Sequence, residues 1–258
     1  MNFLLLFLKG LVIGLFMLVP GISGGSIAII LNLYDELLIN LNDIFKTFRK
    51  SFVFLFVVLV GGILGIFISS FLLDIVIKDY YFEMIYIFTG VMLYYLISLI
   101  TKPSGYNIFK KLFLILFGVI LGSLLMVIPN DLLIFKNEYL QLFLLGIFLA
   151  IALILPGVSV SYVLLLFRLY DDLLLAIQTF DYLFLLKMGI FLLIGIILVI
   201  KFLYYLIINK KETMELIIVG FVVSSLWIVL PPVLNNKMFI YAVIFILLGM
   251  TVNKLIKS

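Results

Sequence analysis

The sequence contains no cysteine and no histidine. Without cysteine the chain can form no disulfide, no iron–sulfur cluster and no thiolate metal site. Without histidine it lacks the commonest metal ligand, the usual general base at neutral pH, and the Ser–His and Cys–His nucleophile pairs. Because the sequence also shows no cluster of aspartates suited to Mg²⁺, we predict no metal and no cofactor.

Charged residues are scarce as well. Among 258 residues there are 17 Lys and Arg and 13 Asp and Glu, or 12%, whereas 67% are apolar. A soluble domain carries about 25% charged residues, so a chain with so few predicts an integral membrane protein. The net charge of +4 is spread through the loops. It therefore indicates membrane orientation, and no nucleic-acid partner is predicted.

One segment superficially resembles a serine nucleophile on a glycine turn. Ser23 lies between Gly21 and Gly24, as in an intramembrane serine protease. Such an enzyme needs a base, and Lys9 is the lysine nearest in sequence. Without histidine only a Ser–Lys variant would remain, so we do not predict an enzyme.

Six apolar segments are long enough, or nearly so, to cross a hydrocarbon core of ~30 Å, which takes ~20 helical residues. They are residues 52–73, 84–101, 112–130, 182–208, 216–236 and 238–253. Two further apolar stretches, residues 10–34 and 139–167, are each interrupted by a Pro-Gly pair. The fold class predicted is all-α, with several transmembrane helices.

The two interrupted stretches are copies of one another. At an offset of 136 residues, VPGISGGSIAIILNLYDELL from Val19 lies over LPGVSVSYVLLLFRLYDDLL from Leu155. We therefore predict a duplicated membrane domain, with repeat 1 at residues 1–130 and repeat 2 at residues 131–258. Each repeat would hold one Pro-Gly-broken helical hairpin and three transmembrane helices.

The basic residues predict how the two repeats are oriented. If each broken element is a hairpin, the repeats are inverted, and 15 Lys and Arg outside the elements divide eleven to four between the two sides. If each element is one crossing helix, the repeats are parallel and the same residues divide eight to seven. The positive-inside rule favours inverted repeats with both termini cytoplasmic. Arms of ~16 residues, or ~24 Å, favour re-entrant hairpins, although fully spanning arms would give the same sidedness.

The Pro-Gly-x-Ser elements are candidate binding sites. Proline blocks helix continuation, glycine permits positive φ and serine caps the next helix, so each element predicts a helix, a break and a helix. Breaks entering from opposite faces would bring helix N-termini and hydroxyls together near the midplane, which suits an anion and phosphate in particular. The candidate residues are Gly21, Ser23, Gly24, Gly25, Ser26, Gly157, Ser159 and Ser161.

Arg168 is a further candidate. It follows Ser161 by seven residues, which on one helix gives a shared face at about 10 Å. A bidentate phosphate contact would explain an arginine within an uncharged run. The alternative is that Arg168 pairs with Asp171 or Asp172. Its repeat partner is the neutral Asn32.

Several other residues are accessory candidates: Lys9, Asn32, Tyr34, Asp35, Tyr170 and Asp171. The Tyr-Asp pairs end the second arm of each predicted hairpin, where interfacial anchoring is favoured over proton or substrate handling. Lys9 could hold a headgroup or extend to the interface along its aliphatic stem. Glycines in small-xxx-small spacing indicate close helix packing. They are Gly10 with Gly14, Gly61 with Gly65, and Gly118 with Gly122.

The paired elements, each followed about ten residues later by Tyr-Asp, resemble a bacterial and archaeal membrane family. That family was long a domain of unknown function and is now assigned as polyprenyl-phosphate transporters. Its pattern is close to PGxSGGT in the first element and PGxSGS in the second, each followed by Gly-x-Tyr and an acidic residue. PGISGGS at residues 20–26 matches well. Val160, Arg168 and Asn32 stand where the pattern has glycine.

The resemblance implies a transporter of undecaprenyl phosphate, moving this carrier lipid from the outer to the inner leaflet of a prokaryotic cytoplasmic membrane. The expected partners are the polyprenyl-phosphate substrate and membrane lipid. Three alternatives stay open: a transporter of a small soluble anion, an enzyme acting on a lipid phosphate, and an assembly scaffold. The missing histidine and cysteine count against the enzyme, and the absence of large soluble loops counts against the scaffold.

Overall fold

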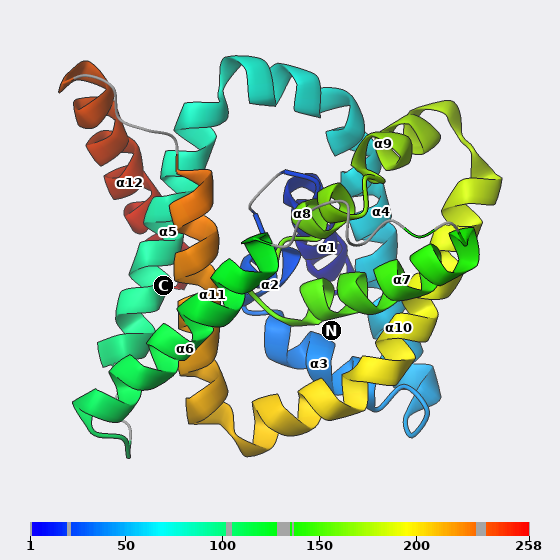
Figure 1. Cartoon of the computed structure of the whole chain (residues 1–258), viewed down its shortest axis with the longest axis horizontal. Coiled ribbons are helices and arrows are strands. Elements are labelled where there is room, and N and C mark those ends of the chain that lie inside the picture. The colour runs from blue at the N-terminus through cyan, green and yellow to red at the C-terminus, as the bar shows by residue number, and fades with distance from the viewer. Residues whose placement is uncertain are drawn as a thin grey trace.

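The computed structural model describes residues 2–19, 22–101, 105–127, 135, 137–230 and 236–257. These residues form twelve helices and no strand, which confirms the all-α prediction (Figure 1). The first six are α1 (Phe3–Met17), α2 (Gly24–Ile30), α3 (Tyr34–Asn42), α4 (Phe48–Asp79), α5 (Tyr81–Thr101) and α6 (Ile108–Val127). The others are α7 (Glu138–Ile154), α8 (Val160–Leu166), α9 (Tyr170–Thr179), α10 (Tyr182–Asn209), α11 (Lys211–Val229) and α12 (Asn236–Lys257).

Helices occur at all six predicted membrane segments. Two parts of them, Phe48–Leu72 of α4 and Tyr182–Asn209 of α10, are long and apolar enough to cross a membrane, with mean hydropathies of 2.8 and 2.9. Both are mostly unburied within the molecule, since only 22% and 17% of the residues in their apolar stretches are buried. Apolar helices that expose their side chains need lipid around them, so the chain is a polytopic membrane protein.

The helices of the two halves pair in matching ways. Counting along the chain, α1–α6 correspond to α7–α12. Helix α1 packs along α4, and its counterpart α7 packs along α10. Helix α5 packs along α12, and α11 packs along α6, so helices of one half pack against helices of the other. Figure 1 shows α4 leading into α5 across the top of the view and α10 leading into α11 across the bottom. The repeat boundaries themselves stay a prediction.

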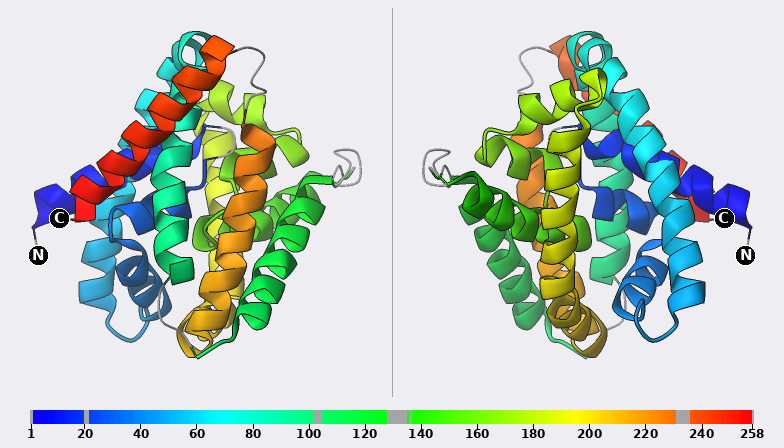
Figure 2. Two further views of the ribbon diagram at one scale, coloured as in Figure 1. Left: turned by 90° about the vertical axis from the view of Figure 1, so that its left-hand side faces the viewer. Right: turned by 90° about the vertical axis from the view of Figure 1, so that its right-hand side faces the viewer.

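The glycine pairs allow these helices to pack closely, as predicted. A Cβ added at Gly10 of α1 would lie 2.3 Å from the Val58 carbonyl oxygen of α4. One at Gly118 of α6 would lie 2.2 Å from the Ile217 carbonyl oxygen of α11. Because real Cβ atoms do not approach backbone so closely, any side chain there would force the helices apart. Figure 2 shows α12 running beside α5 at the edge that also holds both termini.

The second arms of the hairpins are shorter than predicted. Helix α2 ends at Ile30 and α3 starts at Tyr34, with a bend of 117° between them. The second hairpin is built in the same way, with α8 ending at Leu166 and α9 starting at Tyr170. The Tyr-Asp pairs therefore begin new helices, and the prediction that they end the second arms is wrong. Each arm is interrupted because its chain leaves the α conformation at Asn32 or Arg168.

Candidate functional site

The two Pro-Gly elements meet in the interior. We call the first break the segment between α1 and α2 and the second break the segment between α7 and α8. A Cβ added at Gly25, in the first turn of α2, would lie 3.1 Å from Pro156 Cα of the second break. The Ser161 hydroxyl donates to the Val19 carbonyl of the first break at 3.1 Å. The predicted convergence of the two elements is thus observed. Pro20 and the candidate Gly21 lie outside the described residues.

The serines of the second break form a hydrogen-bonded chain. Ser159 caps α8 by accepting a bond from the Tyr162 N–H at 3.3 Å, and its Oγ lies 2.7 Å from Ser161 Oγ. Because the Ser161 proton goes to the Val19 carbonyl, the Ser159 proton must go to Ser161. Both serines are buried, and both hydroxyl protons are used inside the protein.

The equivalent serine of the first break is bonded differently. Ser23 has almost the same backbone angles as Ser159, with φ −97° and ψ 129° against −87° and 128°. Its side chain nevertheless caps nothing, and its Oγ is buried with no hydrogen-bond partner among the described residues. The neighbouring candidates Gly24, Gly25 and Ser26 are buried too. A buried hydroxyl without a partner costs about 1–3 kcal/mol, so this position favours a bound ligand.

Two tyrosines connect the halves in a symmetric way. The Tyr34 hydroxyl donates to the Ile154 carbonyl at 2.7 Å, and the Tyr170 hydroxyl donates to the Leu18 carbonyl at 2.9 Å. Each carbonyl lies at the end of the helix before a break. The N–H groups four residues on bond the next carbonyl instead, Ile22 to Val19 and Val158 to Leu155. Both tyrosines are buried at 9% exposure, so the predicted interfacial anchoring is wrong. Both donors and both acceptors are related by the 136-residue offset of the repeat, so the two bonds are equivalent.

Arg168 does not lie on the helix face predicted for it. Helix α8 ends at Leu166, and Arg168 follows in a left-handed conformation with φ 54° and an exposed side chain. Its partner Asn32 has φ 51°. The premise that Ser161 and Arg168 share a helix face is therefore wrong. Glycine takes this conformation without strain, which explains the glycine in the family pattern at both positions.

Gly157 and the remaining accessory candidates lie at other places. Gly157 has φ +90°, and a Cβ there would lie 2.7 Å from the Val222 nitrogen of α11, so its role is packing. Lys9 is half-buried on α1, and Asp171 is exposed at the start of α9. Asp35 forms an ion pair with Lys211 at 3.5 Å, between α3 and α11.

The Asp35–Lys211 pair borders a cavity of about 370 Å³ beneath the first hairpin. Its lining residues come from the corner of α2 and α3 and from the facing ends of α10 and α11. They are Ile29, Asn32, Tyr34, Asp35, Glu36, Ile207, Lys211, Met214, Glu215 and Ile218. With three carboxylates against one lysine, the cavity disfavours a phosphate.

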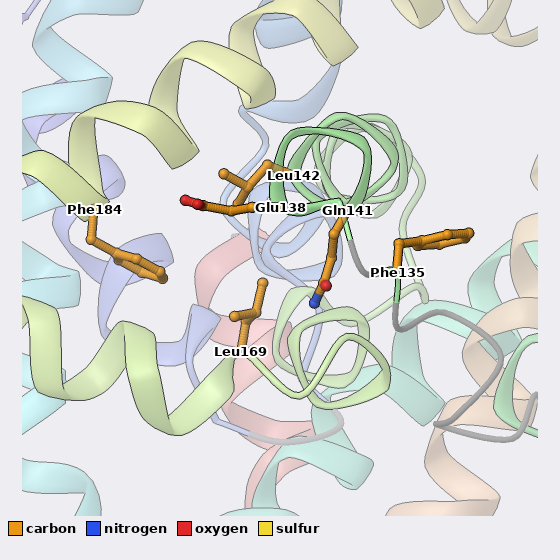
Figure 3. Close-up of a pocket in the computed structure, with 6 residues that line it drawn as sticks. All are labelled: Phe135, Glu138, Gln141, Leu142, Leu169 and Phe184. Atoms are coloured by element: carbon orange, nitrogen blue, oxygen red, sulfur yellow. The ribbon is translucent and has the colours of Figure 1, made fainter.

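A second cavity, of about 180 Å³, lies at the corner of α8 and α9 (Figure 3). Its lining residues are Phe135, Glu138, Gln141, Leu142, Leu169 and Phe184. The Gln141 amide donates to the Phe167 carbonyl at 3.1 Å, and Glu138 forms an ion pair with Lys187 at 2.9 Å. None of the predicted site residues lines it.

The chemistry available where the breaks meet is hydrogen-bond donation. Hydroxyls and the first N–H groups of α2 and α8 gather there, and none of the candidates at the breaks is a carboxylate, a lysine or an arginine. Among the described residues no three His, Cys, Asp or Glu side chains lie together as a metal site. Such an arrangement can hold the oxygens of an anion. Helices of seven residues add only a modest dipole to those direct bonds.

Comparisons with known proteins identify the family. The model of a family described as undecaprenyl phosphate translocase-like matches residues 13–242. A polyprenyl-phosphate transporter of Staphylococcus aureus is 29% identical over 259 residues, covering 93% of this chain and 91% of that protein. A polyprenyl-phosphate transporter of Vibrio cholerae is 29% identical over 197 residues, covering 70% of this chain and 62% of that protein. No solved structure matches. The family match includes both breaks and confirms the resemblance, so the chain belongs to the undecaprenyl phosphate translocase-like family.

Proposed function

We propose that this protein moves a polyprenyl phosphate, such as undecaprenyl phosphate, from the outer to the inner leaflet of a prokaryotic cytoplasmic membrane. The phosphate headgroup binds where the two breaks meet, and the isoprenoid tail stays in lipid. The observation that carries the proposal is the Ser23 hydroxyl, which is buried at that meeting point and has no partner among the described residues. The names of the relatives support the lipid, and the breaks supply hydrogen-bond donors for its phosphate.

The proposed cycle requires movement, because the hydroxyls at the breaks are buried in this conformation. The two halves would rock against each other and open the headgroup site to one leaflet at a time. Both termini and the Asp35–Lys211 pair would lie on the cytoplasmic side, following the distribution of basic residues. Arg168 is left out of the headgroup site because its side chain is exposed and α8 ends before it.

Leaflet exchange in proteoliposomes tests the function. The expected result is rapid exchange of polyprenyl phosphate with the wild-type protein and a loss of about tenfold or more in Ser23→Ala, since a hydrogen bond to a charged group is worth about 1.5–3 kcal/mol. Ser51→Ala is the matched control, because Ser51 is equally buried but lies on α4 and bonds Thr47.

Two other outcomes would contradict the proposal. Uptake of a water-soluble anion that lipid phosphate does not inhibit would indicate a soluble-anion transporter. Release of inorganic phosphate from the lipid would indicate an enzyme.

A further inference from the structure

We propose that the two breaks have different tasks, with the α2 tip contacting the phosphate and the α8 tip acting as a fixed support. The α2 tip is Ser23, Gly24 and Gly25, and the α8 tip is Ser159, Val160 and Ser161. This inference rests on the proposed function, because it assigns the contacts made within that headgroup site. The ligand it implies is a phosphate monoester.

The hydroxyls differ between the tips. Ser23 is 2% exposed and its Oγ has no partner among the described residues, so one donor and its acceptor capacity are open to a ligand. In the α8 tip, the Tyr162 N–H, Ser159, Ser161 and the Val19 carbonyl form one continuous chain of hydrogen bonds. The serine hydroxyls of the α8 tip could donate to a phosphate only after these hydrogen bonds break. The Ser23 hydroxyl of the α2 tip could donate without breaking any hydrogen bond.

The residues after each serine also differ. A Cβ added at Gly24 would lie 3.6 Å from Ile13 and 3.7 Å from Met17, which are ordinary van der Waals distances. The fold therefore does not require glycine there, and the counterpart Val160 carries a full side chain that is buried. Packing does not require glycine at position 24. Its lack of a side chain instead leaves room for a ligand to approach the backbone N–H groups.

Gly25 is a glycine for another reason. Its added Cβ would lie 3.1 Å from Pro156 Cα and 3.2 Å from Pro156 N, and backbone atoms give way poorly. The second break thus rests against the first turn of α2, and Ser161 binds the Val19 carbonyl of the first break. These contacts join the second break to the first, so Ser161 stabilises the fold and its hydroxyl does not contact the phosphate.

The test is the affinity of the purified protein in nanodiscs for polyprenyl phosphate, measured together with its thermal unfolding. In Gly24→Ala and Ser23→Ala we expect the Kd to rise about tenfold or more while the unfolding temperature stays the same or rises. In Ser161→Ala we expect a lower unfolding temperature with a Kd within about twofold of wild type. Val160→Ala gives a second variant of the α8 tip, with the same expected Kd, if Ser161→Ala does not fold.

The outcomes separate the two proposals. Wild-type affinity in Gly24→Ala, or an equal loss of affinity in Val160→Ala and Ser23→Ala, would overturn the division of tasks while leaving the transport proposal intact. No binding of polyprenyl phosphate to the wild-type protein would overturn the proposed function itself. Displacement of the bound lipid by millimolar inorganic phosphate would show that the phosphate alone is recognised, and failure to displace it would show that the lipid chain contributes.

Discussion

Asn32 and Arg168 show how much a single backbone angle decides in this fold. Both have φ above 50° and both stand between a seven-residue helix and the next helix. The face predicted for Arg168 assumed one continuous helix from Ser161. Residue spacing could not show that this helix, α8, ends at Leu166, two residues before Arg168. The serines were correctly placed at the breaks because Pro-Gly-x-Ser acts locally, through φ restriction and, in the second break, through capping by Ser159.

Glycine at position 168 should give a more stable protein than alanine at that position. The left-handed conformation costs a side-chain-bearing residue about 1–2 kcal/mol, and glycine avoids that cost. Arg168→Ala is the matched control, because it removes the same side chain but keeps a Cβ. We expect the Arg168→Gly variant to unfold at a temperature about 2–8 °C above that of Arg168→Ala. Equal unfolding temperatures in a thermal scan would contradict the left-handed assignment.

At the scale of the elements, the hairpins depend on groups supplied by the other half. The carbonyls of Leu18 and Ile154 are bonded by Tyr170 and Tyr34, over sequence separations of 152 and 120 residues. Repetition of the sequence predicted that the elements are equivalent, and the glycine spacing predicted which surfaces pack closely. Neither could predict the tyrosine contacts, because partners so distant in sequence are set by the tertiary arrangement.

Removing one tyrosine hydroxyl should therefore weaken the joint between the halves. Tyr34→Phe or Tyr170→Phe leaves a buried carbonyl without that bond, at a cost of about 1–3 kcal/mol. We expect each variant to lower the unfolding temperature. Tyr182→Phe is the control, since Tyr182 is 72% exposed and should tolerate the change. A Tyr34→Phe variant as stable as the control would show that the bond contributes nothing.

Two glycines of α10 provide a paired test of helix packing. A Cβ at Gly195 would lie 2.2 Å from the Gly146 carbonyl oxygen, whereas one at Gly189 would have no atom within 4 Å. Gly195→Ala should destabilise the protein by about 1–3 kcal/mol, and Gly189→Ala should stabilise it by about 1 kcal/mol through helix propensity. Thermal unfolding of both variants checks the sign of each change. A Gly195→Ala variant as stable as the wild type would contradict the close packing of α10 on α7.

Across the whole molecule, the two halves are joined by exchanged helices, with α12 against α5 and α6 against α11. The sequence predicted the six long apolar helices and their order, because apolar length and the repeat are visible in one dimension, but it did not predict α3 and α9 as separate helices. It did not predict that helices of one half pack against helices of the other. Charge and hydropathy indicate on which side of the membrane a segment ends, but they do not indicate which helices pack against it. This arrangement couples the halves, so rocking of one would move helices that pack on the other.

The orientation of the whole chain can be tested with single cysteines, because the natural sequence has none. Phe45 and Tyr182 are 75% and 72% exposed and lie on opposite sides in the inverted arrangement. A membrane-impermeant maleimide applied to intact spheroplasts should label Tyr182→Cys. Phe45→Cys should be labelled only after the membrane is opened. Labelling of both positions in intact spheroplasts would contradict the inverted repeats.

We propose that a lipid phosphate binds where the two Pro-Gly breaks meet. The most direct test is an experimental structure of the protein in nanodiscs with polyprenyl phosphate bound. We predict phosphate density within hydrogen-bonding distance of Ser23 Oγ and the N–H groups of Gly24 and Gly25. Phosphate density in the cavity beside Asp35 and Lys211, with the Ser23 hydroxyl still unbonded, would contradict it.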